Sequence, residues 1–208
     1  MIAAGLAVGA YALFARLSVS SEQQHLVEQY RGTDQGAPAS AQATAGFDTE
    51  ASAEVPALPN PDVAQPSEGE NSNPATLAVL TIPSIDLEVA VRQGVGSYSL
   101  RYSVGHYIPS VMPGEAGNCV IMGHRNYTYG EFFNRLDELT EGDTIIVERG
   151  DTIYTYVVTE KFVVEPSDTS VLDQTDDAML TLITCTPIRV ATHRLIVRAT
   201  LQSTQAMG

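Results

Sequence analysis

Apolar and polar residues alternate along much of the chain after residue 77, and this alternation predicts short β-strands. It is clearest through Leu180 and Leu182 and again in residues 195–199. A period of two is typical of a strand with one buried face. Pro187 lies between these two segments and suits a loop better than a continuous helix. We therefore predict two antiparallel neighbours joined by a hairpin of moderate length.

The same pattern predicts further strands in the rest of this region. They cover residues 79–82, 87–91, 118–122, 143–147, 152–158 and 163–166. Short helices are expected at residues 99–102 and around residues 132–139, where Phe132, Leu136 and Leu139 have helical spacing. Many short strands, one or two short helices and no βαβ rhythm predict an all-β fold closed into an antiparallel β-barrel.

Residues 1–19 are predicted to be a membrane anchor or a signal segment. The run from Ile2 to Phe14 is almost entirely apolar, and it approaches the roughly 20 residues of a spanning helix only if Arg16 snorkels to the interface. No small-X-small cleavage site is clear, which favours a retained anchor over a cleaved signal peptide. Two features oppose an anchor, because no Lys or Arg precedes the run and Arg16 lies on what would be its outer side.

Three further segments follow along the chain. Residues 20–31 contain good helix formers after a Ser start and predict a juxtamembrane helix. Residues 32–76 are rich in Ala, Pro, Ser, Gly and acidic side chains and contain no Lys or Arg. This composition cannot bury enough apolar surface to offset its ordering entropy, so it predicts a disordered acidic linker. Residues 77–208 are then the folded barrel domain.

Composition limits the partners of this domain. The net charge is -14 and Lys161 is the single lysine, which argues against nucleic acid, since its phosphates would be repelled, and against a polybasic grip on anionic lipid. Acidic residues at Asp173, Asp176 and Asp177 match no metal-binding spacing, so we expect a solvated loop and no metal or other cofactor.

Cys185 is the first candidate for chemistry, because it ends one of the two paired strands. The predicted hairpin brings Arg194 back beside it, and a guanidinium next to a thiol favours the thiolate and stabilises developing negative charge. The structural alternative is a small buried Cys185 and a solvated Arg194. A disulfide to Cys119 would consume the candidate nucleophile, so both cysteines are interpreted as thiols, with Cys119 packed in the core.

Two histidines compete for the role of partner to this thiol. His124 falls just past the end of a buried strand, where a side chain can reach a cleft. His106 is flanked by Gly105 and loop residues well before that strand, so a structural role is expected for it.

These motifs together resemble the sortases, the cysteine transpeptidases of Gram-positive cell surfaces. The similarity rests on Thr184 and Cys185 at the end of a strand, an Arg nine positions on, and Gly123-His124-Arg125 after a short apolar strand. It extends from about residue 80 to residue 201 and includes Gly105-His106-Tyr107 in the same order along the chain.

The resemblance implies a sortase-type barrel and a complete reaction. Cys185 would be the nucleophile, His124 the partner that holds and returns the proton, and Arg194 the donor to substrate or oxyanion, with Thr184 lining the groove. Such an enzyme cleaves a Leu-Pro-X-Thr-Gly-like sorting signal after Thr through a thioester. It passes the surface protein to an amine of a peptidoglycan precursor or of a pilin Lys, and it works outside the cell from a single-pass membrane anchor.

The motif details resemble class D and class C sortases. Class C enzymes usually add a lid with an Asp-Pro-aromatic motif and a C-terminal membrane helix, neither of which is apparent here, so class D is the closer match. Two other functions stay open on the residues alone. One is a tethered β-barrel binding or adhesin domain with an inert Cys185, and the other is a hydrolytic cysteine protease using the same residues.

Overall fold

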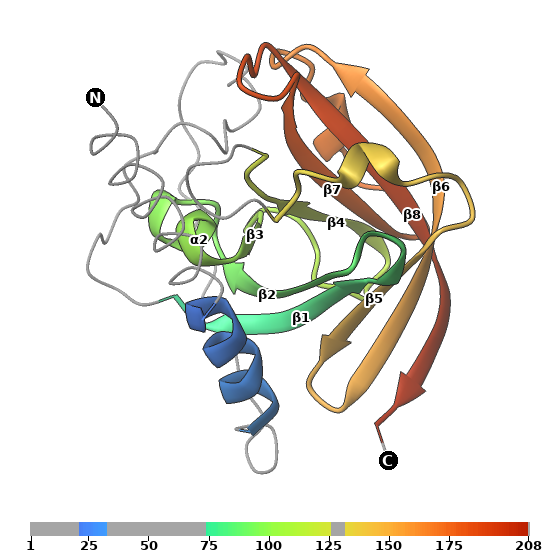
Figure 1. Cartoon of the computed structure of the whole chain (residues 1–208). Helices are drawn as coiled ribbons and strands as arrows, with labels where there is room; N and C mark the ends of the chain where they lie inside the picture. Colours follow the sequence, from blue (N-terminus) through green and yellow to red (C-terminus); the bar gives the residue numbers. More distant parts are fainter. Residues whose placement is uncertain (1–20, 33–73, 126–131, 208) are drawn as a thin grey trace, which may run out of the picture.

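The computed structural model describes residues 21–32, 74–125 and 132–207 (Figure 1). The predicted anchor at residues 1–19 and most of the predicted linker at residues 32–76 lie outside the described residues, and these domain boundaries stay predictions. Within the described ranges, no helix has the length and apolar character needed to cross a membrane.

Eight strands form a closed barrel (Figure 1). Their bounds are β1 Thr76–Ile82, β2 Leu87–Gln93, β3 Val104–His106, β4 Gly117–Met122, β5 Thr144–Arg149, β6 Thr152–Val164, β7 Ala178–Thr186 and β8 His193–Ala206. Short helices connect some of them: η1 Pro83–Ile85, α2 Ser97–Tyr102, η2 Leu136–Glu138 and η3 Ser170–Leu172. The predicted closed, mostly β fold with short helices is therefore confirmed.

The order of strands around the barrel is β1-β2-β3-β4-β7-β8-β6-β5. Most neighbours are antiparallel, as expected, but β2 with β3 and β4 with β7 are parallel. The second parallel pair decides at which edge of the barrel His124 and Cys185 lie. Parallel strands end at the same edge of a sheet, and the antiparallel β8 begins there.

Two segments differ from the simple strand and helix pattern. The regions expected as separate strands at residues 152–158 and 163–166 are joined in β6, which follows β8 along its length with two register shifts. Residues 132–139 form turns and η2 instead of a regular helix. Their spacing nevertheless buries Leu136 and Leu139 completely, because both side chains pack in the core.

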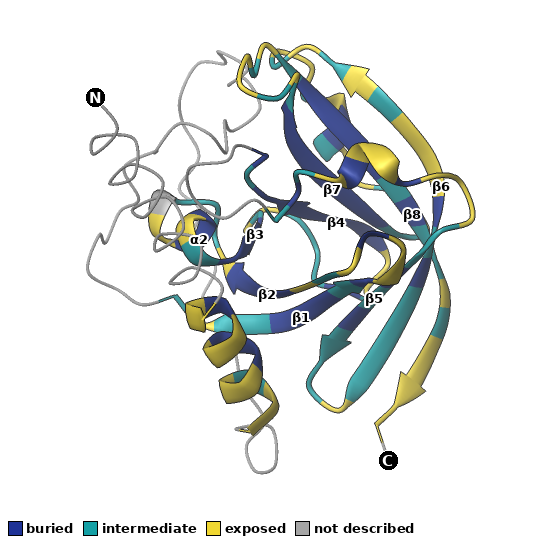
Figure 2. Cartoon of the chain, viewed as in Figure 1, coloured by how far each residue is buried: buried dark blue, intermediate teal, exposed yellow. Residues whose placement is uncertain are grey.

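Apolar side chains form an inner core and an outer cluster on opposite faces of the barrel wall. Buried residues predominate along β4 and β7 (Figure 2). The inner core takes residues from all eight strands, so it fills the barrel. The outer cluster consists of Val120, Met122, Val171, Ile183 and Ile196. Val171 belongs to η3, so the segment between β6 and β7 covers this outer face.

The structure has a helix at residues 21–32, where the sequence predicts a juxtamembrane helix over residues 20–31 (Figure 1). This helix packs on the barrel, a contact that the sequence patterns did not indicate. Leu26 and Val27 are buried against β1 and β2. The Tyr30 hydroxyl donates to the Leu77 carbonyl at 3.0 Å and accepts from the Gly150 amide at 2.8 Å. These contacts hold the helix to β1 and to the turn between β5 and β6.

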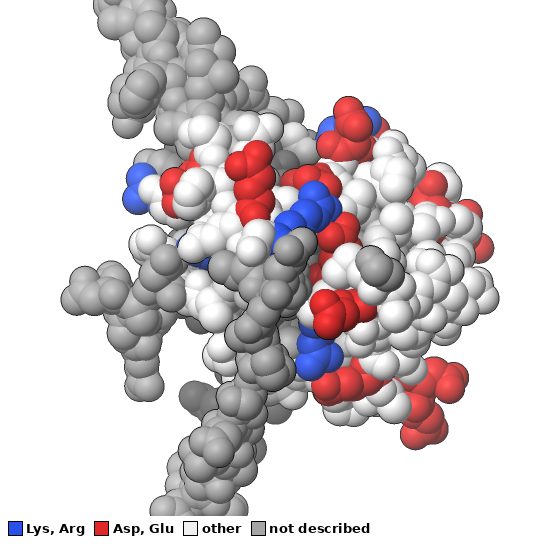
Figure 3. All heavy atoms as spheres, turned by 90° about the horizontal axis from the view of Figure 1, so that it is seen from below, with Lys and Arg blue, Asp and Glu red and all other residues white. Residues whose placement is uncertain are grey.

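Acidic side chains are spread over the face seen from below, with a few basic ones between them (Figure 3). Arg31 is one of the paired cations, at 2.7 Å from a Glu148 carboxylate oxygen and 3.0 Å from one of Glu88. This distribution agrees with the excess of acidic residues in the sequence.

Candidate active site

Cys185 and Arg194 are direct cross-strand partners at the end of β7 and the start of β8. Both are almost completely buried, with 1% and 2% of their surface exposed. The hairpin predicted from the alternating pattern therefore places the guanidinium-bearing residue opposite the cysteine. Neighbouring residues across an antiparallel pair lie about 5 Å apart at the backbone.

His124 reaches the same edge through the parallel pairing of β4 and β7. Met122 is aligned with Ile183, and each lies two residues before the position of interest, His124 in one case and Cys185 in the other. Two hydrogen bonds continue the alignment past the end of β4. The Gly123 amide donates to the Ile183 carbonyl at 3.1 Å, and the Thr184 hydroxyl donates to the Gly123 carbonyl at 2.8 Å.

Cys185 and Arg194 belong to one face of the sheet, and His124 follows the end of β4 at the same edge. Ile183 and Ile196 are members of the outer cluster, and they lie two positions from Cys185 and Arg194 along β7 and β8. Side chains two residues apart on a strand share a face. The topology thus places Cys185 and Arg194 on the outer face and His124 at the same barrel edge, beside the segment that carries η3.

Arg194 keeps unused hydrogen-bonding capacity in this position. Its Nη1 donates to the backbone carbonyls of Ala191 and His193 at 3.4 and 3.1 Å. Its Nε is buried and has no hydrogen-bond partner among the described residues. A buried donor without a partner is costly, so a bound acyl group or oxyanion that accepts from this nitrogen would be favoured.

Thr184 directly precedes Cys185 on β7, so its side chain points to the inner face of the barrel wall and that of Cys185 to the outer face. It is fully buried, and it shares the inner face with Leu182 of the inner core. Its hydroxyl bonds the Gly123 carbonyl, which ties the end of β4 to β7. This contact is a structural one, and lining of a substrate groove by Thr184 stays a prediction.

Arg125 is a residue of this region whose role the sequence patterns did not reveal. Only 5% of it is exposed, and its Nη1 donates to the Thr186 hydroxyl at 2.7 Å and lies 3.5 Å from the Cys185 carbonyl oxygen. Its Nη2 pairs with Asp137 at 2.9 Å. The sequence feature that could have pointed to Arg125 is its position directly after His124. Only the fold brings Arg125 beside Thr186.

The other candidate histidine, His106, is buried and makes its hydrogen-bond contacts with residues of the following loop. His106 is 4% exposed, and its Nε2 lies 2.9 Å from the Val111 carbonyl and 3.1 Å from the Ser110 hydroxyl. Burial lowers its pKa from the ordinary value of 6.5, because the charged imidazolium loses hydration. These contacts stay within its own loop, and a structural role for His106 remains the prediction.

The second cysteine is part of the inner core. Cys119 is 1% exposed, and burial raises the pKa of its thiol to about 12. A thiol in this state is a poor nucleophile at neutral pH. No group of three or more His, Cys, Asp or Glu side chains suited to a metal occurs in the described part of the chain.

Comparison with known proteins places this arrangement in a family. A sortase domain model matches residues 80–202. Sortase SrtE1 of Streptomyces coelicolor is 37% identical over 136 residues, which are 58% of this chain and 38% of that protein. Sortase D of Bacillus subtilis is 28% identical over 188 residues, which are 90% of this chain and 86% of that protein.

Solved structures agree with the sequence relatives. A Clostridium perfringens sortase D5 transpeptidase has a TM-score of 0.58 at 36% identity, covering 62% of this chain and 79% of that one. Sortase E1 from Streptomyces coelicolor, solved with a tripeptide in the active site, has a TM-score of 0.59 at 32% identity, covering 63% and 90%. The relatives include sortases of classes A, C, D and E, so they do not single out one class.

The matching region is the barrel itself, and it contains the three residues at the end of β4, the end of β7 and the start of β8. This chain spans 38% and 60% of the lengths of the Streptomyces coelicolor SrtE1 and Listeria monocytogenes sortase A relatives. On the domain match over more than half its length, the chain belongs to the sortase family of cysteine transpeptidases.

Proposed function

We propose that this protein is a transpeptidase that cleaves a Leu-Pro-X-Thr-Gly-like sorting signal after Thr and transfers the surface protein to an amine. The observation that carries the proposal is the common barrel edge of His124, Cys185 and Arg194. No pair among them is adjacent in sequence, and a barrel without this chemistry has no need to gather them.

The reaction follows from the three groups. The sulfur of Cys185 attacks the Thr carbonyl carbon of the signal, and the carbon–nitrogen bond to Gly breaks to leave a thioester. His124 gives a proton to the departing amine. An acceptor amine then attacks the thioester carbon, the carbon–sulfur bond breaks, and the proton lost by the amine returns to the site. Arg194 supplies hydrogen bonds to the oxygen that becomes negative in both steps.

The cellular setting is proposed on the family and the sequence together. Residues 1–19 would anchor the protein in the cell membrane with its catalytic domain outside, and residues 32–76 would give that domain reach. Its partners would be surface proteins with a sorting signal and an amine of a peptidoglycan precursor or a pilin Lys. Among the classes, D is proposed on the motif details, supported by the likeness to the sortases named D and D5.

A sorting-signal peptide panel tests the nucleophile. The full chain is incubated with each peptide, and intact mass spectrometry is used to find a covalent acyl adduct, which peptide mapping then assigns. We expect the adduct on Cys185 and its loss in Cys185→Ala. Cys119→Ala is the matched control, because that thiol lies in the inner core and its substitution should leave the adduct in place.

Two outcomes would count against the proposal. A panel that gives no adduct with folded protein would remove the covalent mechanism, and an adduct on Cys119 would remove Cys185. Adding an amine such as a glycine peptide separates transfer from hydrolysis. A new amide product supports the transpeptidase, whereas exclusive release of the free acid would favour the hydrolytic protease.

A further inference from the structure

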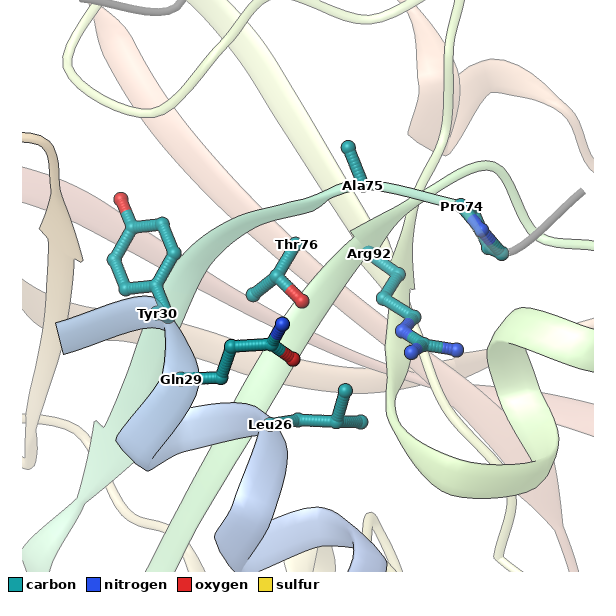
Figure 4. A pocket seen from close by; sticks show the side chains of 7 residues that line it. All are labelled: Leu26, Gln29, Tyr30, Pro74, Ala75, Thr76 and Arg92. Atoms are coloured by element: carbon teal, nitrogen blue, oxygen red, sulfur yellow. The ribbon is translucent and has the colours of Figure 1, made fainter. Parts of the chain in front are cut away.

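A second site lies on the side of the barrel where the helix of residues 21–32 packs (Figure 4). A cavity of about 200 Å³ opens there between this helix and the ends of β1 and β2. Its lining consists of Leu26, Gln29, Tyr30, Pro74, Ala75, Thr76 and Arg92. Strand β2 is separated from the catalytic β7 by β3 and β4, so this cavity is distinct from the proposed active site.

Arg92 is the unusual member of this lining. It is 2% exposed, and its Nε and Nη1 are buried without a hydrogen-bond partner among the described residues. Its guanidinium lies over the Tyr98 ring, 5.5 Å from the centroid. The ring covers one face of the cation, but ring contacts do not satisfy in-plane N–H donors.

The contrast with Arg31 shows what is absent at Arg92. Arg31 belongs to the same helix and barrel interface, is partly exposed, and pairs with two carboxylates. Arg92 is much more buried and has no carboxylate within an ion-pair distance among the described residues. A buried cation without an anion is among the most costly arrangements in a protein, so a group that neutralises it would bind with a large gain.

We propose that this cavity binds an oxyanion, a phosphate or a carboxylate, at the guanidinium of Arg92. Arg92 lines the cavity and has no carboxylate partner among the described residues, so a charge-assisted hydrogen bond to such a group would compensate its buried charge. Gln29 and Thr76 add polar side chains to the same cavity (Figure 4). The Tyr98 ring covers one face of the guanidinium, so an anion would meet the N–H donors in the guanidinium plane.

The oxyanion can come from solution or from one of the seven carboxylates in residues 33–73. Isothermal titration of the full chain with inorganic phosphate, against chloride at equal ionic strength, tests the first source. A variant with those seven residues changed to their amides tests the second. Saturable binding to the parent chain, with a Kd at or below about 1 mM, supports a free ligand. Binding that appears only in the amide variant supports an internal carboxylate.

Substitution of Arg92 tests whether phosphate binding depends on this side chain. Arg92→Met should abolish phosphate binding and Arg92→Lys should weaken it at least about tenfold, because Lys keeps the charge but loses the fork. Arg101→Gln is the charge-matched control, since Arg101 is exposed on α2, and it should bind as the parent does. In phosphate-free buffer the amide variant should melt at a higher temperature when it also carries Arg92→Met, because the unpaired charge is gone.

The proposal fails if phosphate binds neither the parent chain nor the amide variant. It also fails if Arg92→Met and Arg101→Gln lose binding to the same extent, or if binding persists in Arg92→Met. The test measures only the heat of phosphate binding and the melting temperature of the protein. Its result is therefore independent of Cys185 and of the proposed transpeptidase reaction.

Discussion

Arg125 and Thr186 are joined by a 2.7 Å hydrogen bond between the guanidinium Nη1 and the hydroxyl. One residue follows His124 and the other follows Cys185, so this bond connects the two segments that carry the proposed proton carrier and nucleophile. Asp137 holds the other end of the same guanidinium at 2.9 Å. The chain leaving β4 is thereby fastened to β7 on one side and to η2 on the other.

Loss of the carboxylate behind Arg125 should destabilise the fold. In Asp137→Asn the buried guanidinium loses its charged partner, and we expect a decrease of about 1–2 kcal/mol in the free energy of unfolding, measured by chemical denaturation. Glu138→Gln is the matched control in the same short helix. Glu138 pairs with the exposed Arg135, so its loss should leave stability within error. Equal losses in both variants would refute the role assigned to Arg125.

Arg194→Lys should impair turnover although the positive charge is kept. A lysine cannot reproduce the planar set of donors, and loss of one oxyanion donor costs about 100-fold or more in rate. Peptide cleavage kinetics measure kcat and KM, and the decrease is expected mainly in kcat. Arg198→Lys is the control on the same face of β8, where the ion pair to Glu160 can persist. Parent rates in Arg194→Lys would remove this residue from the mechanism.

Tyr30→Phe tests whether the helix of residues 21–32 is held by specific contacts. The hydroxyl serves both the Leu77 carbonyl and the Gly150 amide, so its removal leaves two partly buried backbone groups without their partner. We expect a loss of about 1–2 kcal/mol in unfolding free energy. Tyr98→Phe, at a ring that is 42% exposed, is the comparison and should cost less. Faster protease cleavage near residues 21–32 would show local release of the helix.

Stability should fall in mild acid because of His106. Burial lowers its pKa below 6.5, so the unfolded chain takes up a proton at a pH where the folded chain does not. The unfolded state then binds more protons, and stability rises with pH across this window. The contribution is complete above pH 6.5 and is lost as the pH falls through the lowered pKa.

Denaturation curves at several pH values between 7.5 and 5 measure this effect. His106→Asn should flatten the acid-side decrease, and His25→Asn, in an exposed position of the helix, is the control for removing an imidazole. An unchanged slope in His106→Asn would mean that another group controls acid stability.

Much of the fold followed from local patterns in the sequence. The period-two segments at Leu180 and Leu195 predicted the β7 and β8 hairpin, and its register did place Arg194 opposite Cys185. Residues 132–139 had helical spacing yet form turns and η2, because burial of Leu136 and Leu139 requires only that these side chains reach the core. Spacing reports which residues are buried more reliably than it reports backbone geometry.

The sequence by itself determined which chemistry is available: one cysteine at a strand end, one histidine after a buried strand and one arginine in a returning strand, in the order of a known family. Only the tertiary structure decided that they lie at one barrel edge, because this depends on the parallel pairing of β4 with β7 across about 60 residues of chain. The same is true of Arg125 at Thr186 and of the buried Arg92. A side chain's neighbours across a barrel are set by strand order and register, which local residue patterns do not encode.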